Sequence, residues 1–262
     1  MWTAGDKTMR TEEFLTEFCL CEEADKREAR YRPHQSLYLE GDPARLVFQI
    51  TAGVVIVFRL LADGRRQIHR FATRGDLLAL DFADLYSHNA EAITEVSAEV
   101  YDRPWFDRTF QDHPDFRRGV FRHLTDTLTA SQEQAVMLGR KSAMERTASF
   151  ICFLLQKAPA DVRHSYIVIR MSRYDIADYL GLTFETVSRM LHRLKKLGVI
   201  DLPKPDRFKV LNWPVLAQLA GEAETAGRYL PCAMALKRVE PAAFTAGPLP
   251  AEFSQQRSQP YS

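Results

Sequence analysis

The chain reads SRYDIADYLGLTFETVSR from Ser172 to Arg189, and this stretch predicts two short helices joined by a tight corner. Ser172 and Asp175 stand three residues apart, the spacing of a capping box that satisfies free backbone N–H groups at a helix start. Gly181 is placed to end the first helix, and Thr183 is placed to cap the second. We therefore expect a helix-turn-helix over residues 173–193.

The second of these helices has two distinct faces. Apolar residues spaced by three and four must face a core; they are Val187, Met190, Leu191 and Leu194. The opposite face carries Glu185, Ser188, Arg189, His192, Arg193 and Lys196. Glu, Ser and Arg on the amino-terminal half of a helix suit the major groove of DNA, because Arg can donate twice to guanine and Glu can accept from a base amino group.

We predict that Glu185, Ser188 and Arg189 read DNA bases. The residues expected to meet the DNA backbone or to flank the reading group are Arg173, Thr183, His192, Arg193 and Lys196. Backbone contacts add salt-dependent affinity without sequence information. Two other readings of this segment are a solvated helical hairpin and a protein-binding module, and the latter predicts no salt-dependent affinity for palindromic DNA.

Local charge agrees with a nucleic-acid partner. From Arg170 to Lys209 the chain holds nine Lys or Arg and five Asp or Glu, a formal charge of +4 against +1 for all 262 residues. Gly198 should end the second helix, and 199–202 and 207–211 then read as two strands of a wing. Residues 140–218 are accordingly predicted as a winged helix-turn-helix domain.

The amino-terminal half shows regularly spaced turn signals. Gly41, Gly53, Gly64 and Gly75 recur at intervals of 12, 11 and 11 residues, with short β-branched or aromatic runs between them. Alternating residues predict a last strand from Glu91 to Tyr101, with Ile93 on its wet face. This pattern is typical of antiparallel strands in a jelly roll. Residues 30–110 are therefore expected to form a β-roll, preceded by an amino-terminal segment over 1–29.

A long helix is expected over residues 111–139. Its narrow apolar stripe consists of Phe116, Val120, Leu124, Leu128, Ser131, Ala135 and Leu138. Such a stripe can pack on the roll, or it can form a two-stranded coiled-coil seam. The DNA-binding interpretation favours the seam, and hence a homodimer. A further helix over 143–156 and a short strand over 166–169 complete the predicted α+β fold.

Composition, the amino-terminal sequence and the cysteines indicate the class of protein and its compartment. Hydrophobic residues are 46% and charged residues 26% of the chain, as in an ordinary globular protein. We find neither a secretory leader nor a run of 18 apolar residues, so no membrane partner is expected. Cys19, Cys21, Cys152 and Cys232 are too scattered for a disulfide framework, and the chain reads as cytoplasmic. Residues 219–262 are rich in proline and are expected to be disordered.

The stretch from Ser172 to Arg189 closely resembles the recognition segment of the Crp–Fnr superfamily, and most of all its FixK-like branch. The likeness extends over roughly 18–216. It implies a dimer with a cyclic-nucleotide-binding-like β-roll, a dimerisation helix and a winged domain. In Fnr-like members a Glu-x-x-Ser-Arg motif reads a TTGAT…ATCAA palindrome, and here that motif is Glu185, Ser188 and Arg189. The resemblance also implies an activator of microaerobic, nitrogen-fixation or denitrification genes that contacts RNA polymerase.

Departures from the family's sensors suggest that no cofactor is bound. Oxygen-sensing members hold an iron–sulfur cluster with four cysteines, whereas only Cys19 and Cys21 lie close together here and the next is Cys152. Cyclic-nucleotide binders grip the phosphate with Gly-Glu and Arg-Ser pairs. The comparable stretches here read ALD over residues 79–81 and HNA over 88–90, without an arginine for the phosphate.

Two alternatives to a cofactor-free regulator remain. A haem or redox ligand in the roll would use His34, His69 or His88 as an axial ligand. A cupin-type enzyme with an accessory winged domain would need a His-x-His pair and a following Glu. His69 is followed by Arg70 and Phe71, so that motif is missing and the chain is not expected to be an enzyme.

Overall fold

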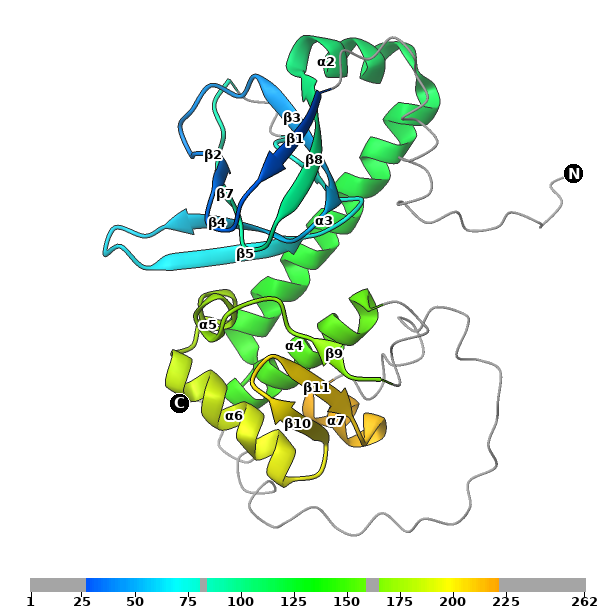
Figure 1. The fold of residues 1–262 in the computed structure, drawn as a ribbon. Coiled ribbons are helices and arrows are strands. Elements are labelled where there is room, and N and C mark those ends of the chain that lie inside the picture. Colours follow the sequence, from blue (N-terminus) through cyan, green and yellow to red (C-terminus); the bar gives the residue numbers. More distant parts are fainter. Residues whose placement is uncertain (1–26, 81–83, 159–164, 222–262) are drawn as a thin grey trace, which may run out of the picture. The chain divides into compact units, whose positions relative to one another are not determined.

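The structure is a computed structural model that describes residues 27–80, 84–158 and 165–221. These residues belong to one structural unit, 1–223, and a second unit, 224–262, lies outside the described residues together with the predicted tail. Along the described chain a set of strands comes first, followed by the long helix α3 and then a helical domain with three short strands (Figure 1). The α+β architecture predicted from the sequence is confirmed.

Two four-stranded antiparallel sheets form the amino-terminal roll. One sheet has the order β1 (Arg27–Tyr31), β8 (Val96–Asp102), β3 (Leu46–Ala52) and β6 (Leu77–Leu78). The other has the order β2 (Ser36–Tyr38), β7 (Asn89–Ala92), β4 (Val55–Leu60) and β5 (Arg66–Ala72). Strand β1 begins at Arg27, so the boundary expected at residue 30 falls within a strand.

The four glycines that signalled turns all have positive φ, between 83° and 90°. The requirement is strictest at Gly53, between β3 and β4. A Cβ added there would lie within 3 Å of backbone atoms of Glu95 and Val96, whereas one added at Gly64 would meet nothing within 4 Å. Gly53 therefore allows the close approach of two chain segments, while Gly64 serves only the backbone conformation of its turn.

The prediction of a single strand from Glu91 to Tyr101 is wrong. The chain leaves the second sheet after Ala92 in β7 and joins the first sheet at Val96 in β8. Thr94, in the intervening bend, accepts a hydrogen bond from the backbone N–H of Val54 at 2.9 Å. Ile93, expected on the wet face, is half-buried against the core cluster that strands β4 and β5 share with the carboxy-terminal domain. Alternation continues across the bend, so the pattern alone did not reveal that the two halves belong to different sheets.

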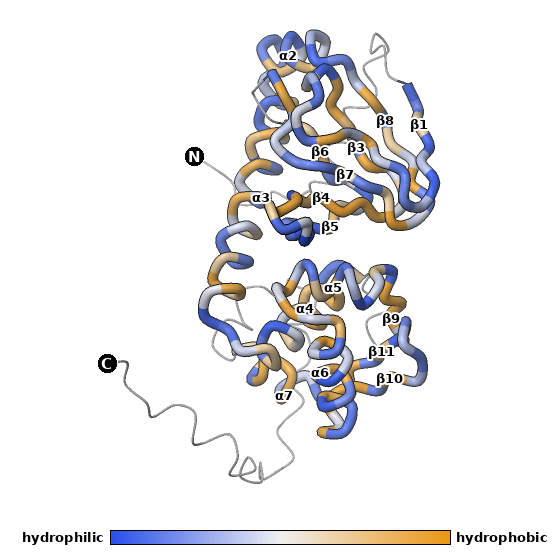
Figure 2. Tube along the Cα trace, turned by 90° about the vertical axis from the view of Figure 1, so that its left-hand side faces the viewer, coloured by the Kyte–Doolittle hydropathy of each residue, from blue (hydrophilic) through white to orange (hydrophobic). Residues whose placement is uncertain are grey.

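The first four residues of strand β4 are buried, on both faces of the strand. Val55 and Val57 point into the roll, where they pack with Phe48 and Val100. The alternate residues of β4 belong to the core cluster that also contains the interior of the helix-turn-helix domain. A continuous apolar run is the sequence signature of such a strand, and Figure 2 shows β4 mostly in the colour of hydrophobic residues.

Three helices follow the roll: α2 (Arg103–Asp112), α3 (Pro114–Arg140) and α4 (Ala143–Lys157). The long helix and α4 were predicted, but α2 was missed because Pro104 and Pro114 looked like chain breaks. Proline is compatible with the first turn of a helix, where its missing N–H has no partner to lose. Here Pro104 is the second residue of α2 and Pro114 is the first residue of α3.

The carboxy-terminal domain contains α4, β9 (Ile167–Val168), α5 (Arg173–Leu180), α6 (Phe184–Lys196), β10 (Ile200–Lys204), β11 (Arg207–Val210) and α7 (Trp213–Leu219). Its three strands pair in the order β10-β11-β9. The predicted wing and the short strand before the helix-turn-helix are confirmed, and α7 was missed. Among the residues that the structure describes, every helix is too short or too polar to cross a lipid bilayer.

Candidate nucleic-acid interface

Helix α5 begins at the predicted capping box. The Ser172 hydroxyl oxygen accepts a hydrogen bond from the Asp175 backbone N–H at 3.1 Å, and the Asp175 carboxylate accepts from the Ser172 N–H at 3.0 Å. Gly181 ends the helix in the left-handed conformation, with φ +59°. The start, the stop and the corner of the helix-turn-helix are therefore where the sequence placed them.

Helix α6 is held by its amino-terminal cap and its apolar face. The Thr183 hydroxyl accepts from the Thr186 N–H at 3.2 Å, as a capping residue does. The four residues predicted to face the core, Val187, Met190, Leu191 and Leu194, are all buried. Burial of this face fixes the rotation of the helix and leaves the opposite face to solvent.

The three predicted base-reading residues lie together on that solvent face. Glu185 and Arg189 are exposed, and Ser188 is half-buried between the exposed face and the core. Residues four apart on a helix differ by only about 40° around its axis, so Glu185 and Arg189 point the same way. Hydrogen bonds from its own backbone N–H and from the Thr183 hydroxyl lower the pKa of Glu185, which keeps the carboxylate charged.

The predicted flanking residues have different surroundings. Arg193 and Lys196 are exposed near the end of α6, and a ring nitrogen of His192 lies 2.9 Å from the Ser188 carbonyl oxygen. Thr183 is the helix cap described above. Arg173 is half-buried, and its guanidinium donates to the Pro205 carbonyl oxygen at 2.5 Å. In this structure Arg173 therefore fastens α5 to the wing turn.

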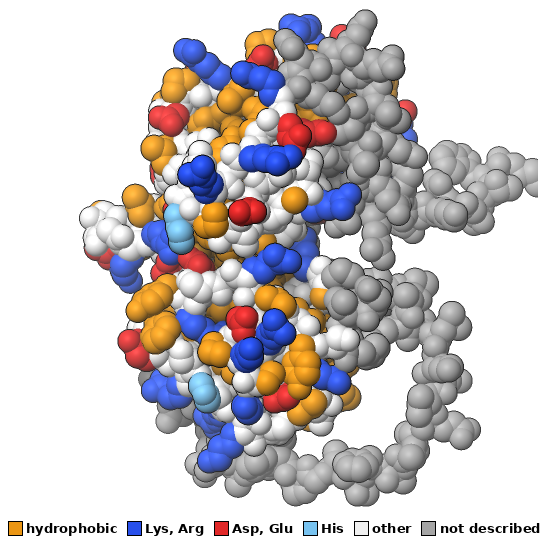
Figure 3. Space-filling model, viewed as in Figure 1, with side chains coloured by type: hydrophobic (Ala, Val, Ile, Leu, Met, Phe, Trp, Pro, Cys, Tyr) orange, Lys and Arg blue, Asp and Glu red, His pale blue; other side chains and the backbone are white. Residues whose placement is uncertain are grey.

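Basic side chains gather over the helix-turn-helix and wing, in the lower part of the face shown in Figure 3. Lys195 donates to the Leu202 carbonyl oxygen at 2.8 Å and so joins α6 to strand β10. The wing strands β10 and β11 present Lys204, Arg207 and Lys209 within the same basic stretch. The domain thus carries exposed cationic groups on α6 and on the wing together with the exposed Glu–Ser–Arg stripe, a combination that suits a nucleic-acid duplex.

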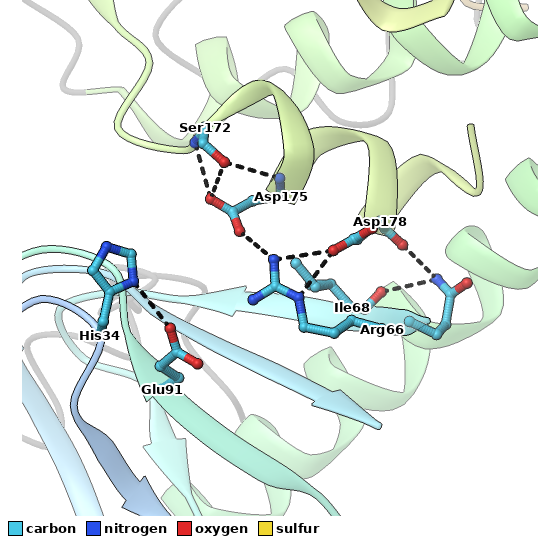
Figure 4. A network of polar contacts seen from close by, with 8 residues as sticks. His34, Arg66, Ile68, Glu91, Ser172, Asp175 and Asp178 are labelled. Carbon is cyan, nitrogen blue, oxygen red and sulfur yellow. Dashed lines mark hydrogen bonds and ion pairs between the residues drawn. The ribbon is translucent and has the colours of Figure 1, made fainter. Parts of the chain in front are cut away.

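A clamp between strand β5 and helix α5 was not foreseen from the sequence (Figure 4). The guanidinium of Arg66 donates to Asp175 at 2.9 Å and to Asp178 at 3.0 Å. The Gln67 side-chain amide donates to the Asp178 carbonyl oxygen at 3.0 Å. Arg66 lies 109 and 112 residues from its partners, so no local pattern signals the contact. The clamp ties the first helix of the helix-turn-helix to the roll.

Buried Gln134 of α3 adds a second polar link. Its side-chain amide donates to the Ile68 carbonyl oxygen at 2.9 Å and to the Tyr179 carbonyl oxygen at 3.3 Å. Arg146 of α4 likewise donates to the carbonyl oxygens of Leu138 at 2.7 Å and Leu180 at 3.0 Å. These bonds to backbone groups join the long helix, the roll and α5 to one another.

Comparison with known proteins decides the family. Residues 145–219 match the Crp-like helix-turn-helix domain, and residues 28–113 match the cyclic nucleotide-binding domain. The nitrogen fixation regulation protein FixK of Rhizobium meliloti is 33% identical over 191 residues, covering 70% of this chain and 86% of that protein. The chain belongs to the Crp–Fnr family. It is a DNA-binding transcription regulator close to the FixK regulators, as the resemblance indicated.

Two further relatives of this Crp–Fnr regulator agree. The transcriptional activatory protein AadR of Rhodopseudomonas palustris is 35% identical over 184 residues, covering 70% of this chain and 77% of that protein. The solved structure of FixK2 from Bradyrhizobium japonicum superposes with a TM-score of 0.70 at 33% identity. That match covers 74% of this chain and 96% of the FixK2 chain. These relatives are transcription regulators rather than enzymes.

The apolar stripe of the Crp–Fnr regulator's long helix is buried in its first part and exposed in most of the rest. Phe116 and Val120 are buried with Phe106 in the chain's own core, and Leu124 packs partly against them. The assignment of Phe116 and Val120 to a dimer seam was therefore wrong, because the roll and α2 already cover them. Leu124 is half-buried, and its place in a seam stays a prediction. Farther along α3, the exposed members of the predicted stripe are Leu128, Ser131 and Ala135, whereas Leu138 is half-buried. Exposed Phe121 and Val136 add further apolar surface to the helix.

The interior of the regulator's roll contains a cluster of buried hydrophobic side chains. Where the family's cyclic-nucleotide binders place a Gly-Glu pair, Ala79 is buried with a positive φ of 63°. Leu80 is half-buried against the cluster of Val47 and Phe106, and Asp81 lies outside the described residues. The His69 and His88 rings meet edge to face at 4.9 Å, and exposed His34 lies 3.3 Å from the Glu91 carboxylate.

Metal-binding side chains do not converge within the described ranges, which hold no group of three or more His, Cys, Asp or Glu that could hold an ion. Cys152 is buried in the core of the carboxy-terminal domain. Cys19, Cys21 and Cys232 lie outside the described residues.

Proposed function

We propose that this regulator is an activator that binds a TTGAT…ATCAA palindrome as a homodimer and controls microaerobic, nitrogen-fixation or denitrification genes. The observation that carries the proposal is the exposed stripe of Glu185, Ser188 and Arg189 on a helix whose other face is buried. The similarity to FixK regulators supports the class of target genes. Contact with RNA polymerase in the cytoplasm follows from the activator role.

Each base-reading residue has a chemical role in this proposal. The Arg189 guanidinium donates to O6 and N7 of the guanine in each half-site, and the Glu185 carboxylate accepts from an amino group of cytosine or adenine. Ser188 donates to a base edge or a phosphate. Arg193 and Lys196 meet phosphates farther along the backbone, where they add affinity equally for all sequences.

We also propose that different parts of the chain have different functions. Residues 140–218 bind DNA, and the exposed part of α3 beyond Leu124 meets the same helix of a second copy. Two-fold symmetry of such a dimer would match the symmetry of the palindrome, with each α6 entering one half-site. The roll before Asp112 resembles an effector-binding domain, and we propose that it binds no cofactor.

Fluorescence anisotropy on a TTGAT…ATCAA duplex at two salt concentrations tests the proposal. We expect Arg189→Ala to lose roughly 1–3 kcal/mol of discrimination against a duplex in which the guanine is replaced. Arg118→Ala is the matched control, because Arg118 is an exposed arginine on α3 paired with Asp115. Equal affinity of the wild-type protein for palindromic and scrambled duplexes would refute the proposal, and affinity independent of salt would favour a protein-binding role.

A further inference from the structure

Helix α5 is held at both ends by segments from other parts of the chain. Toward its amino-terminal end, the Arg66 guanidinium of β5 donates to the carboxylates of Asp175 and Asp178 (Figure 4). At its carboxyl end, Arg146 of α4 donates to the Leu180 carbonyl oxygen at 3.0 Å. Five residues separate Asp175 from Leu180, which is about 7.5 Å along a helix axis. Two points of attachment this far apart prevent α5 from pivoting about either one.

The break between α3 and α4 is the place about which such a pivot would occur. Helix α3 ends at Arg140 and α4 begins at Ala143, and the two residues between them, Lys141 and Ser142, have extended backbone conformations. Element-terminal residues of this kind are where domains turn relative to one another. Arg146 holds this joint, because it also donates to the Lys141 carbonyl oxygen at 2.9 Å. The Arg66 clamp, on the roll, holds the domain at a second place.

Apolar packing under the clamp attaches the domain without fixing its direction. The Phe71 ring of β5 lies 5.0 Å from that of Tyr179 and 6.1 Å from that of Phe150, between centroids. The hydrophobic effect is non-directional, so rings in contact can shift past one another at small cost. A planar guanidinium bonded to two carboxylates is directional. We therefore assign the direction of α5 to Arg66 and its attachment to the apolar contacts.

The direction of α5 passes to α6 across the tight corner at Gly181. A dimer on a palindrome needs both copies of α6 at one separation and one angle, because the half-sites are fixed on the duplex. We propose that Arg66 is a positioning residue, which sets the direction of each α6 in the dimer and so determines the half-site spacing that the regulator accepts. This inference rests on the proposed function, because it requires a homodimer on a palindrome.

Replacing Arg66 by methionine removes the directional contact. The Gln67 amide, which donates to the Asp178 carbonyl oxygen, and the apolar packing stay in place. Each domain then spends part of its time turned away from the direction that DNA requires. If each copy is correctly turned for about a third of the time, the dimer loses affinity about tenfold, because both copies must be competent together.

The spacing between half-sites provides the test. Each base pair added to or removed from the spacer of a TTGAT…ATCAA duplex turns one half-site by about 35° relative to the other. Anisotropy titrations should show one best spacer for the wild-type protein. Arg66→Met should bind that duplex about tenfold more weakly and should lose most of its preference over the neighbouring spacers. On a duplex with a single half-site the two proteins should agree within about twofold, because one α6 binds whatever its direction in the dimer.

Arg103→Met is the control for a general loss of stability. It removes a guanidinium of α2 that is 15% exposed and bonded to Asp107 at 2.9 Å, and it leaves the Arg66 clamp intact. Its spacer profile should match that of the wild-type protein even where its melting temperature is lower. Circular dichroism melting curves confirm that all three proteins are folded at the temperature of the titrations.

Two results would overturn the inference while leaving the proposed function intact. One is a folded Arg66→Met protein with the wild-type spacer profile, and the other is an equal flattening of the profile by Arg103→Met. A wild-type protein that binds palindromic and scrambled duplexes equally would instead refute the proposed function.

Discussion

Replacing Arg66 by methionine removes the guanidinium that joins strand β5 to helix α5 while keeping much of the side chain's apolar length. The arginine side chain is 28% exposed, and those of its partners Asp175 and Asp178 are 11% and 29% exposed. Its guanidinium carbon also lies 5.6 Å from the centre of the Phe58 ring. The change therefore leaves two partly buried carboxylates facing one another without a counter-charge.

The size of the effect follows from this partial burial. Exposed ion pairs contribute about 0–1 kcal/mol, whereas removing one partner of a fully buried pair costs about 3–5 kcal/mol. The Arg66 clamp lies between these limits, so we expect Arg66→Met to lower the free energy of unfolding by about 2 kcal/mol. For a domain of this size that corresponds to a fall in Tm of about 4–8 °C, measured by circular dichroism.

The loss should depend on pH in a defined direction. Burial raises the pKa of Asp178 above its ordinary value of 3.8, and Asp175 raises it further, while Arg66 opposes both. A carboxyl whose folded-state pKa is raised destabilises the fold as the pH rises through that pKa and the group becomes charged. Without Arg66 the pKa rises more, so the Tm difference from wild type should be largest near pH 7 and should shrink toward about pH 4.

Two further variants make the test specific. Arg65→Met is the matched control, because the neighbouring Arg65 pairs only with Asp63 in the described structure, and that pair is exposed to solvent. It should leave Tm within about 1 °C of wild type. Adding Asp178→Asn to Arg66→Met removes one stranded charge and should recover about half of the lost stability. Equal melting temperatures for Arg66→Met and Arg65→Met would contradict the clamp.

Two other predictions concern the turns and the long helix. Gly53→Ala should cost more stability in urea denaturation than Gly64→Ala, because both need positive φ but only Gly53 meets backbone atoms within 3 Å of an added Cβ; we expect about 3 kcal/mol against about 1 kcal/mol. Equal losses would show that the close approach carries no cost. Leu128→Glu, at an exposed apolar position of α3, should shift sedimentation from dimer to monomer by placing like charges in the proposed seam, whereas Arg118→Glu, outside the stripe, should not. A Leu128→Glu protein that remains dimeric would exclude this part of α3 from the seam.

Much of the candidate interface could be predicted from the sequence because its signals are local. The hydroxyls of Ser172 and Thr183 cap helices that begin at the next residue, and Gly181 ends a helix within its own turn. The spacing of Val187 and Leu191 determines which face of α6 is buried and so leaves Glu185 on the other. These features depend on residues within four positions of one another, so hydrogen bonding and helical periodicity are sufficient to place them.

The sequence by itself thus determined the turns of the roll, the ends of α5 and α6, and the face that carries Glu185 and Arg189. Only the tertiary structure decided that Arg66 clamps α5, that Arg173 bonds the wing, and that Val120 of α3 is buried in its own chain while Leu128 is exposed. Periodicity shows that a face is apolar, but the surface that covers it comes from a distant part of the chain. Long-range partners of a charged or apolar side chain leave no trace in local spacing, because they depend on how the folded segments meet.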